Sequence, residues 1–195
     1  MILYLHGFKS SPQSTKARLI GETLAAAGRA DEYACPQLPA SPAAAIALVL
    51  AIASDVSATQ LTLIGSSLGG YYATWIAEQL GCRAVLLNPA VQPPRDLAHY
   101  VGISNAYHSK ASFEFKHAYI DELRALAVPA ITCAERYFLL AATGDEVLDW
   151  REMQAHYQGA LQHIIDGSDH GISDFAAYLE MVLTFCDAVP NSTPN

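Results

Sequence analysis

The sequence predicts an α/β protein whose mostly parallel sheet is covered by helices on both faces. Short apolar runs alternate along the chain with longer stretches of helical periodicity, and parallel strands need such crossover helices between them. The chain has 195 residues, which fits one domain. Hydrophobic residues make up 52% of it and charged residues only 15%, so a substantial core is expected.

Six apolar runs are expected to form the strands of this sheet. Most of them end at residues that favour turns, such as His-Gly, Asn-Pro or Thr-Gly-Asp. A short run bounded by turn residues is typical of a strand buried on both faces. The six runs are residues 1–5, 32–36, 60–64, 83–87, 137–142 and 160–165.

The stretches between these runs are expected to be helices, because their ends carry capping residues. Ser14 and Ser41 stand at N-cap positions, and Pro42 suits the first turn of the second helix. Gly28 and Gly81 suit the position that follows a last helical turn. The expected helices are residues 14–28, 42–54, 67–80, 148–158 and 173–187.

Residues 91–124 break this alternation. The segment holds two adjacent prolines and is rich in histidine and aromatic residues, and no clean period fits it, although a helix is compatible with residues 119–126. We expect a short lid-like insertion within a single domain of residues 1–189. Residues 190–195 are expected to form a disordered C-terminal tail.

Charge and hydropathy narrow the possible partners. Eleven Lys and Arg residues against nineteen Asp and Glu residues give a net charge of −8, which argues against nucleic acid or an anionic membrane as the main partner. The longest apolar run has eleven residues, whereas a transmembrane helix needs about 20. The first residues lack the pattern of a signal peptide. We therefore expect a cytoplasmic protein with a small-molecule substrate; the sequence leaves its oligomeric state open.

No metal or organic cofactor is expected. The four cysteines form no CxxC pair, so they are expected to be free, buried thiols. His99, His108 and His117 lie nine residues apart, and on a helix successive members would face opposite sides. Because that spacing suits no metal site, we expect these histidines on the lid or the surface.

A nucleophile motif follows the third expected strand. The sequence Gly65-Ser66-Ser67-Leu68-Gly69 has the pattern G-x-S-x-G between a strand and a helix. In that context the pattern indicates a strained turn that exposes the serine hydroxyl at the carboxyl edge of the sheet. Ser67 is therefore the candidate nucleophile. The alternative is a glycine-rich turn that only lets the helix pack closely on the sheet.

A serine nucleophile needs a base, and the base needs an acid that orients it. Asp145 follows the fifth expected strand and His170 follows the sixth, so both are expected at the edge of the sheet that carries Ser67. The chain order serine, acid, histidine also fits this architecture. Alternatives stay open: Asp145 caps the next helix, Glu146 or Asp149 is the orienting acid, or His170 is a surface histidine.

The negative oxygen that forms during acyl transfer needs two backbone N–H donors. The amide of Leu68 follows the nucleophile at the start of a helix, and the amide of Phe8 lies in the turn after the first strand. Gly7 lets that turn approach the substrate closely, and His6 is expected to brace the loop. His6, Gly7 and Tyr71 are assigned to substrate binding.

The insertion and three lysines are the candidates for substrate selection. The aromatic residues of the insertion are expected to form the wall of an acyl pocket, although an ordinary core role remains open. Lys9, Lys110 and Lys116 would suit an anionic leaving group such as coenzyme A, with weak support in an acidic protein.

Five segments, in chain order, resemble the YqiA-like esterases, a small branch of the α/β-hydrolase superfamily. The resemblance covers residues 2–185 and is weakest in residues 91–124. The segments are LYLHGFKSSPQSTKA, LIGSSLGGYYATWIAE, LLNPAV, TGDEVLD and GSDHGI.

The resemblance implies an α/β-hydrolase fold and hydrolysis of carboxylic esters, with acyl-CoA thioesters as a further substrate class. By position it implies Ser67 as nucleophile, Asp145 as acid and His170 as base. It also implies the amides of Phe8 and Leu68 as oxyanion donors. An acyltransferase or a non-catalytic ligand-binding homologue are the alternative functions.

Overall fold

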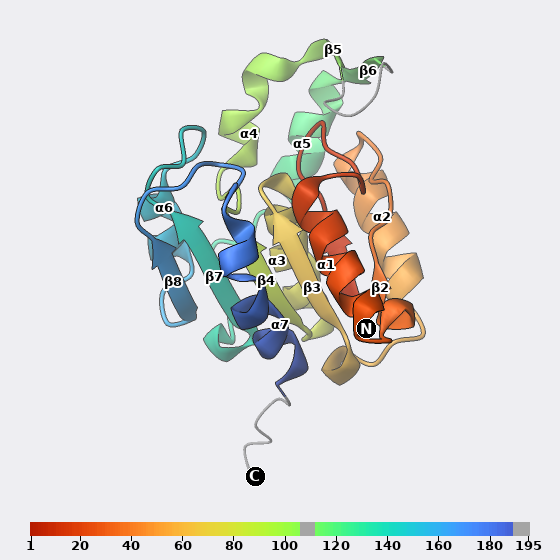
Figure 1. Cartoon of the computed structure of the whole chain (residues 1–195). Helices are drawn as coiled ribbons and strands as arrows, with labels where there is room; N and C mark the ends of the chain where they lie inside the picture. Colours follow the sequence, from red (N-terminus) through yellow and green to blue (C-terminus); the bar gives the residue numbers. More distant parts are fainter. Residues whose placement is uncertain (106–111, 189–195) are drawn as a thin grey trace.

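The computed structural model describes residues 1–105 and 112–188 and shows a layered α/β architecture (Figure 1). Six strands form one sheet in the order β2-β1-β3-β4-β7-β8, and every neighbouring pair is parallel. The predicted fold class is confirmed, and each expected strand is present. The strands are β1 (Ile2–Leu5), β2 (Tyr33–Ala34), β3 (Thr62–Ser66), β4 (Arg83–Leu87), β7 (Tyr137–Ala142) and β8 (Leu161–Ile165).

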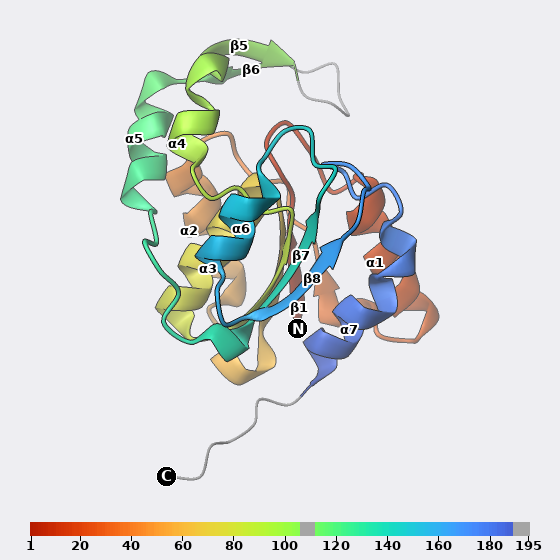
Figure 2. The same cartoon turned by 90° about the vertical axis from the view of Figure 1, so that its left-hand side faces the viewer.

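Helices cover both faces of the sheet. On one face lie α1 and α7, and on the other lie α2, α3 and α6 (Figure 2). The last expected helix is shorter than predicted, because a 3₁₀ turn at Phe175–Ala177 precedes α7. The helices are α1 (Thr15–Ala26), α2 (Pro42–Ala53), α3 (Leu68–Leu80), α4 (Pro93–Asp96), α5 (His117–Ala125), α6 (Trp150–His156) and α7 (Leu179–Asp187).

The central strands are apolar throughout because both of their faces are buried. In β1, Ile2 and Tyr4 belong to the core cluster under α1 and α7, whereas Leu3 and Leu5 belong to the cluster on the other face. All four side chains are at most 3% exposed. Continuous apolar runs, rather than alternating ones, are what a parallel sheet between two helical layers requires.

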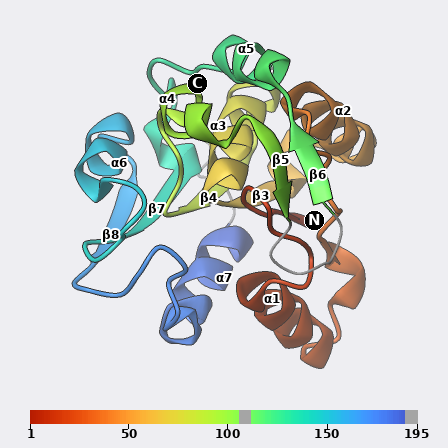
Figure 3. The ribbon, with the colours of Figure 1, turned by 90° about the horizontal axis from the view of Figure 1, so that it is seen from above.

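The segment between β4 and β7 has more regular structure than the sequence indicates. It contains α4, an antiparallel hairpin of β5 (Gly102–Asn105) and β6 (Ser112–Phe115), and α5. Helix α5 begins before the expected 119–126 helix and ends one residue earlier. Figures 2 and 3 show these elements above the carboxyl ends of the sheet strands. The four-residue α4 and β5 are too short to give a detectable period.

Three further expectations concern the cysteines, membrane insertion and the tail. The four cysteines are free, as expected, but only Cys82 is buried and the other three are half-buried. Among the helices of residues 1–105 and 112–188, none is long and apolar enough to cross a membrane. The expected tail at 190–195 lies outside the described residues.

Candidate active site

Ser67 lies at a sharp turn between β3 and α3. Its φ of 54° and ψ of −122° fall in a region that L residues rarely adopt. A Cβ on Gly65 would lie 2.4 Å from the carbonyl oxygen of Gly69, and one on Gly69 would lie 2.0 Å from that of Leu5. Only glycine fits at both positions, so the same residues permit the strained turn and the close packing of α3 on the sheet.

The loop after β1 passes directly beside Ser67. A Cβ on Gly7 would lie 3.1 Å from the Cβ and 3.6 Å from the Oγ of Ser67. Leu68 is the first residue of α3, where backbone N–H groups have no acceptor within the helix. Phe8 and Leu68 both line the cavity that Ser67 lines. The structure therefore brings together the residues that the sequence nominates as nucleophile and oxyanion donors.

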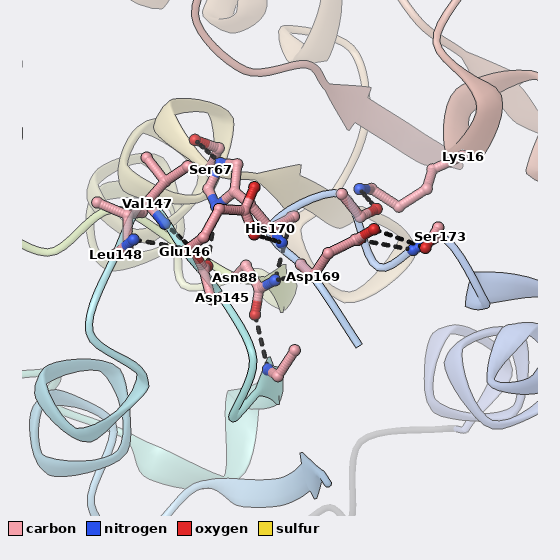
Figure 4. A network of polar contacts seen from close by, with 12 residues as sticks. Lys16, Ser67, Asn88, Asp145, Glu146, Val147, Leu148, Asp169, His170 and Ser173 are labelled. Carbon is pink, nitrogen blue, oxygen red and sulfur yellow. Dashed lines mark hydrogen bonds and ion pairs between the residues drawn. The ribbon is translucent and has the colours of Figure 1, made fainter. Parts of the chain in front are cut away.

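Three side chains from distant parts of the chain form a hydrogen-bonded row (Figure 4). The Nε2 atom of His170 lies 3.0 Å from the Oγ of Ser67. The Nδ1 atom of the same ring lies 2.8 Å from the Oδ2 of Asp145. The Asp145 side chain is fully buried, and that of His170 is 21% exposed. The candidate nucleophile, base and acid thus have the contacts that general-base activation of a serine needs.

Asp145 uses its second carboxylate oxygen to shape its own loop. Its Oδ1 accepts hydrogen bonds from the backbone N–H groups of Val147 at 2.8 Å and Leu148 at 2.9 Å. Both oxygens are therefore engaged, which fixes the plane of the carboxylate facing the imidazole. The buried acid has partners for each of its oxygens, as a buried charge requires.

The neighbouring acids have other partners. The Oε2 of Glu146 accepts the backbone N–H of His170 at 2.9 Å. Asp149 is the N-cap of α6 and accepts from the N–H of Arg151. Asp145 does not cap that helix, so the structure favours it over Glu146 and Asp149 as the group that orients His170.

His6 is held in one tautomer by its contacts. Its Nε2 accepts the backbone N–H of Leu38 at 3.0 Å, so the ring proton belongs on Nδ1, which lies 3.0 Å from the carbonyl oxygen of Gly7. The side chain of Gln37 also contacts Nε2, at 3.1 Å. His6 is 5% exposed and braces the loop, as the sequence predicts, rather than facing the cavity.

Tyr71 does not line the cavity that Ser67 lines. Its hydroxyl donates to the carbonyl oxygen of Leu123 at 2.8 Å and so ties α3 to α5. Burial raises the pKa of this hydroxyl to about 12. The ring lines a separate cavity of about 720 Å³ together with Val91 and Pro129. These contacts indicate a structural role for Tyr71 instead of the expected role in substrate binding.

The cavity at Ser67 has a volume of about 440 Å³ and is closed partly by the insertion. Phe8 packs against Tyr100 at 5.4 Å and against Phe115 at 5.0 Å between ring centroids. Tyr100 lines the cavity, whereas Phe115 is fully buried. The insertion thus supplies both a cavity wall and core. The lining residues are Phe8, Ser67, Leu68, Ala90, Pro93, Arg95, Asp96, Leu97, His99, Tyr100, Glu146, Val147 and Leu148.

Of the three lysines proposed for an anionic leaving group, neither Lys9 nor Lys116 lines this cavity. The Nζ of Lys9 lies 4.6 Å from the ring centroid of Tyr100, so it reaches the cavity wall. Lys116 is exposed before α5, and Lys110 lies outside the described residues. Arg95 does line the cavity, but it is paired with Glu152.

The remaining histidines were considered as metal ligands or surface residues. Within residues 1–105 and 112–188, no group of three or more His, Cys, Asp or Glu side chains is arranged to hold a metal ion. His99 lines the Ser67 cavity and His117 begins α5 at the surface, whereas His108 lies outside the described residues. His156 ends α6, where burial lowers its pKa.

Sequence reasoning missed two buried residues at this site. Asn88 follows β4 and was predicted only to end that strand, and Lys16 was expected only within a helix. Both donate hydrogen bonds to the loop that carries His170. The sequence signal for Asn88 is its place at the carboxyl end of a central strand, where the functional groups of this architecture gather.

The sheet order, the turn at Ser67 and the loop positions of Asp145 and His170 define the α/β-hydrolase fold. The chain matches a family model described as "Uncharacterised protein family (UPF0227)" over residues 1–187. The chain therefore belongs to the UPF0227 family, which is the YqiA family. The resemblance stated from the sequence is confirmed.

Solved structures of α/β hydrolases have the same fold. A protein of Agrobacterium vitis S4 assigned as a hydrolase aligns with TM-score 0.74 and 18% identity, covering 95% of this chain and 87% of that one. Mouse alpha/beta hydrolase domain-containing protein 10 aligns with TM-score 0.70 and 18% identity, covering 94% and 89%. Est1E from Butyrivibrio proteoclasticus, with ferulic acid bound, aligns with TM-score 0.66 and 14% identity, covering 95% and 85%. At these identities the similarity establishes the fold.

Proposed function

We propose that the protein is a serine hydrolase that cleaves carboxylic esters through an acyl-enzyme intermediate. The observation that carries this proposal is the row of hydrogen bonds from Asp145 through His170 to Ser67, with Ser67 lining a cavity. A hydrogen-bonded set of these three groups at the carboxyl edge of the sheet, with the acid buried and the serine at a cavity, favours catalysis over a non-catalytic role.

In the acylation step, the Oγ of Ser67 attacks the acyl carbonyl carbon while the Nε2 of His170 takes the hydroxyl proton. The carbonyl oxygen becomes negative and is stabilised by the N–H groups of Leu68 and Phe8. The bond to the leaving alkoxide then breaks, and the imidazolium gives its proton to that oxygen. Asp145 stabilises the imidazolium throughout this step.

In the deacylation step, water takes the place of the alcohol. His170 accepts a proton from the water as its oxygen attacks the acyl carbon, and the same two amides stabilise the second oxyanion. The ester bond to Ser67 breaks, and its Oγ recovers the proton from the imidazolium. A carboxylic acid leaves and the enzyme returns to its starting state.

The cavity favours acyl groups of modest size with apolar or aromatic character. Phe8, Leu97, Tyr100 and Leu148 provide apolar and aromatic lining. Est1E, which shares the fold, binds the aromatic acid ferulic acid. Thioesters with the same acyl groups fit the same chemistry, and an acceptor other than water would make the enzyme an acyltransferase.

The test measures initial rates on p-nitrophenyl esters from acetate to palmitate, with wild type beside Ser67→Ala. We expect turnover by the wild type and a loss of at least about 1,000-fold in kcat/KM for the variant. A fluorophosphonate should label the wild type and not the variant, whose melting temperature should be unchanged. Equal background rates with esters and thioesters, together with no labelling, would refute a working serine nucleophile.

A further inference from the structure

The loop that carries His170 contains strained backbone as well as internal hydrogen bonds, such as those from Ser173 to Asp169. Gly167, Ser168 and Ile172 all have positive φ, of 79°, 58° and 47°. For Ser168 and Ile172 this region is unfavourable, most of all for a β-branched residue. Backbone strain of this kind persists only where surrounding groups hold it in place, so contacts from outside the loop act together with the internal ones.

Three successive carbonyl groups of the loop accept hydrogen bonds from two distant side chains (Figure 4). The Nδ2 of Asn88 lies 3.0 Å from the carbonyl oxygen of Asp169 and 3.1 Å from that of His170. The Nζ of Lys16 donates to the carbonyl oxygen of Gly171. Asn88 follows β4 and Lys16 lies in the first turn of α1, so the loop is held from two sides.

Asn88 is itself fixed by the strand that leads to the catalytic acid. It is 0% exposed and has a φ of 42°. Its backbone N–H donates to the carbonyl oxygen of Leu140 at 2.9 Å, and its Oδ1 accepts the N–H of Ala142 at 2.8 Å. That contact fixes the orientation of the amide, because Oδ1 must face the N–H of Ala142. The NH₂ group therefore faces the His170 loop.

We propose that Asn88, with Lys16 as a second support, is a positioning residue that sets the imidazole of His170 between Asp145 and Ser67. The inference rests on the proposed function. One side chain joins the end of β7, which leads to Asp145, to the carbonyl group of His170. The side chain of Asn88 therefore fixes the strand that leads to Asp145 and the backbone of His170 relative to each other.

Among the hydrogen bonds described for His170, only the one from Asn88 holds its carbonyl group. Its N–H binds Glu146, and its ring binds Asp145 and Ser67. Loss of the Asn88 contacts would free the carbonyl side of the residue while the strained loop relaxes. A displacement of about 1 Å at a catalytic group is enough to lower the rate of the chemical step about 100-fold.

The test compares Asn88→Asp with the wild type on an active p-nitrophenyl ester. Aspartate keeps the acceptor for Ala142 but replaces the NH₂ donor with an oxygen that faces two carbonyl groups. We expect kcat to fall about 30- to 100-fold with KM changed less than about three-fold. The low-field proton NMR signal of the His170–Asp145 hydrogen bond should shift or disappear in the variant.

A matched control is Tyr137→Phe, which removes a buried hydroxyl bonded to Glu78 at the opposite end of the sheet. It should lower the melting temperature and leave kcat and the low-field signal unchanged. If Asn88→Asp does not fold, Lys16→Met becomes the test and should lower kcat about five-fold or more at unchanged KM.

Three outcomes are separable. An active wild type whose folded Asn88→Asp variant keeps kcat within two-fold and keeps the low-field signal overturns the positioning role. Unchanged kcat in Lys16→Met overturns it when Asn88→Asp does not fold. A wild type that neither turns over esters nor reacts with a fluorophosphonate overturns the proposed function instead.

Discussion

The edge of the sheet and the insertion above it are built by different interactions. At the edge, Ser67, Asp145 and His170 are held by hydrogen bonds of 2.8–3.0 Å and by turns that only certain residues permit. The insertion adds ring packing, such as the 5.4 Å contact between Phe8 and Tyr100, to polar contacts such as the ion pair of Arg95 with Glu152. Hydrogen-bond geometry tolerates little change, whereas aromatic packing accepts many arrangements. The edge should therefore determine the reaction and the insertion the choice of acyl group.

The largest effect is expected at the buried acid. Asp145→Asn keeps the shape of the side chain but no longer stabilises the imidazolium, so kcat should fall about 1,000- to 10,000-fold. Glu146→Gln is the matched control, because its amide oxygen still accepts the N–H of His170; we expect a loss of less than about ten-fold. Both are measured as kcat on one ester. A larger loss in Glu146→Gln would move the role of the acid to Glu146.

A second prediction concerns the turn that exposes Ser67. In Gly69→Ala the new Cβ would meet the backbone carbonyl of Leu5 at 2.0 Å, and a backbone atom cannot move aside as a flexible side chain does. We expect the free energy of unfolding to fall by about 3 kcal/mol. Gly28 has a φ of 74° and open space around it. Gly28→Ala should therefore lower the free energy of unfolding by only about 1 kcal/mol. Urea unfolding measures both, and equal losses would contradict the packing argument.

The sequence predicts the edge better than the insertion because the edge is encoded locally. Each strand, its turn and the functional residue after it are adjacent in the chain, so Ser67, Asp145 and His170 could be named from strand ends alone. Asn88 could not, because its role depends on Ala142 and a loop 81 residues away. A short polar residue after a strand looks the same whether it ends the strand or positions a histidine.

The structure of the insertion is also hard to predict from the sequence, because it too depends on contacts between distant residues. Its α4 and hairpin are short, and their side chains are organised by contacts such as that of Phe115 with Phe8, from the other end of the chain. Tyr71 shows a different limit: the sequence assigns it to substrate binding, whereas its hydroxyl binds Leu123 on α5 and it does not line the Ser67 cavity. Helical neighbours of a nucleophile face several directions, and sequence distance does not select among them.

A third prediction tests whether the insertion selects the acyl group. Tyr100→Ala should enlarge the cavity at Ser67 and shift the preferred p-nitrophenyl ester to a longer chain, with kcat on acetate changed less than about three-fold. Tyr119→Ala is the matched control, because Tyr119 packs on Phe115 at 5.6 Å but does not line the Ser67 cavity. Equal shifts in both variants would show that loosening of the insertion, rather than the cavity wall, changes the preference.

The smallest effect concerns the charge of Lys16, which joins the edge to α1. Burial lowers the pKa of Lys16 to about 8, against a usual value of 10.5, although the carboxylates of Asp169 and Asp145 partly oppose the shift. Between these two pH values the unfolded chain holds a proton that the folded chain has lost. The free energy of unfolding should therefore rise with pH in the wild type relative to Lys16→Met, by about 1 kcal/mol or more from pH 8 to 10.

Urea unfolding of the two proteins at pH 7, 8.5 and 10 measures this difference, and other titrating groups cancel between them. A relative loss of wild-type stability as the pH rises would mean that attraction to Asp169 and Asp145 outweighs burial, which is the reverse sign. Near pH 7 the protonated Lys16 opposes stability, yet it donates to the loop of His170. A charge kept where it destabilises the fold is consistent with a role in holding the edge.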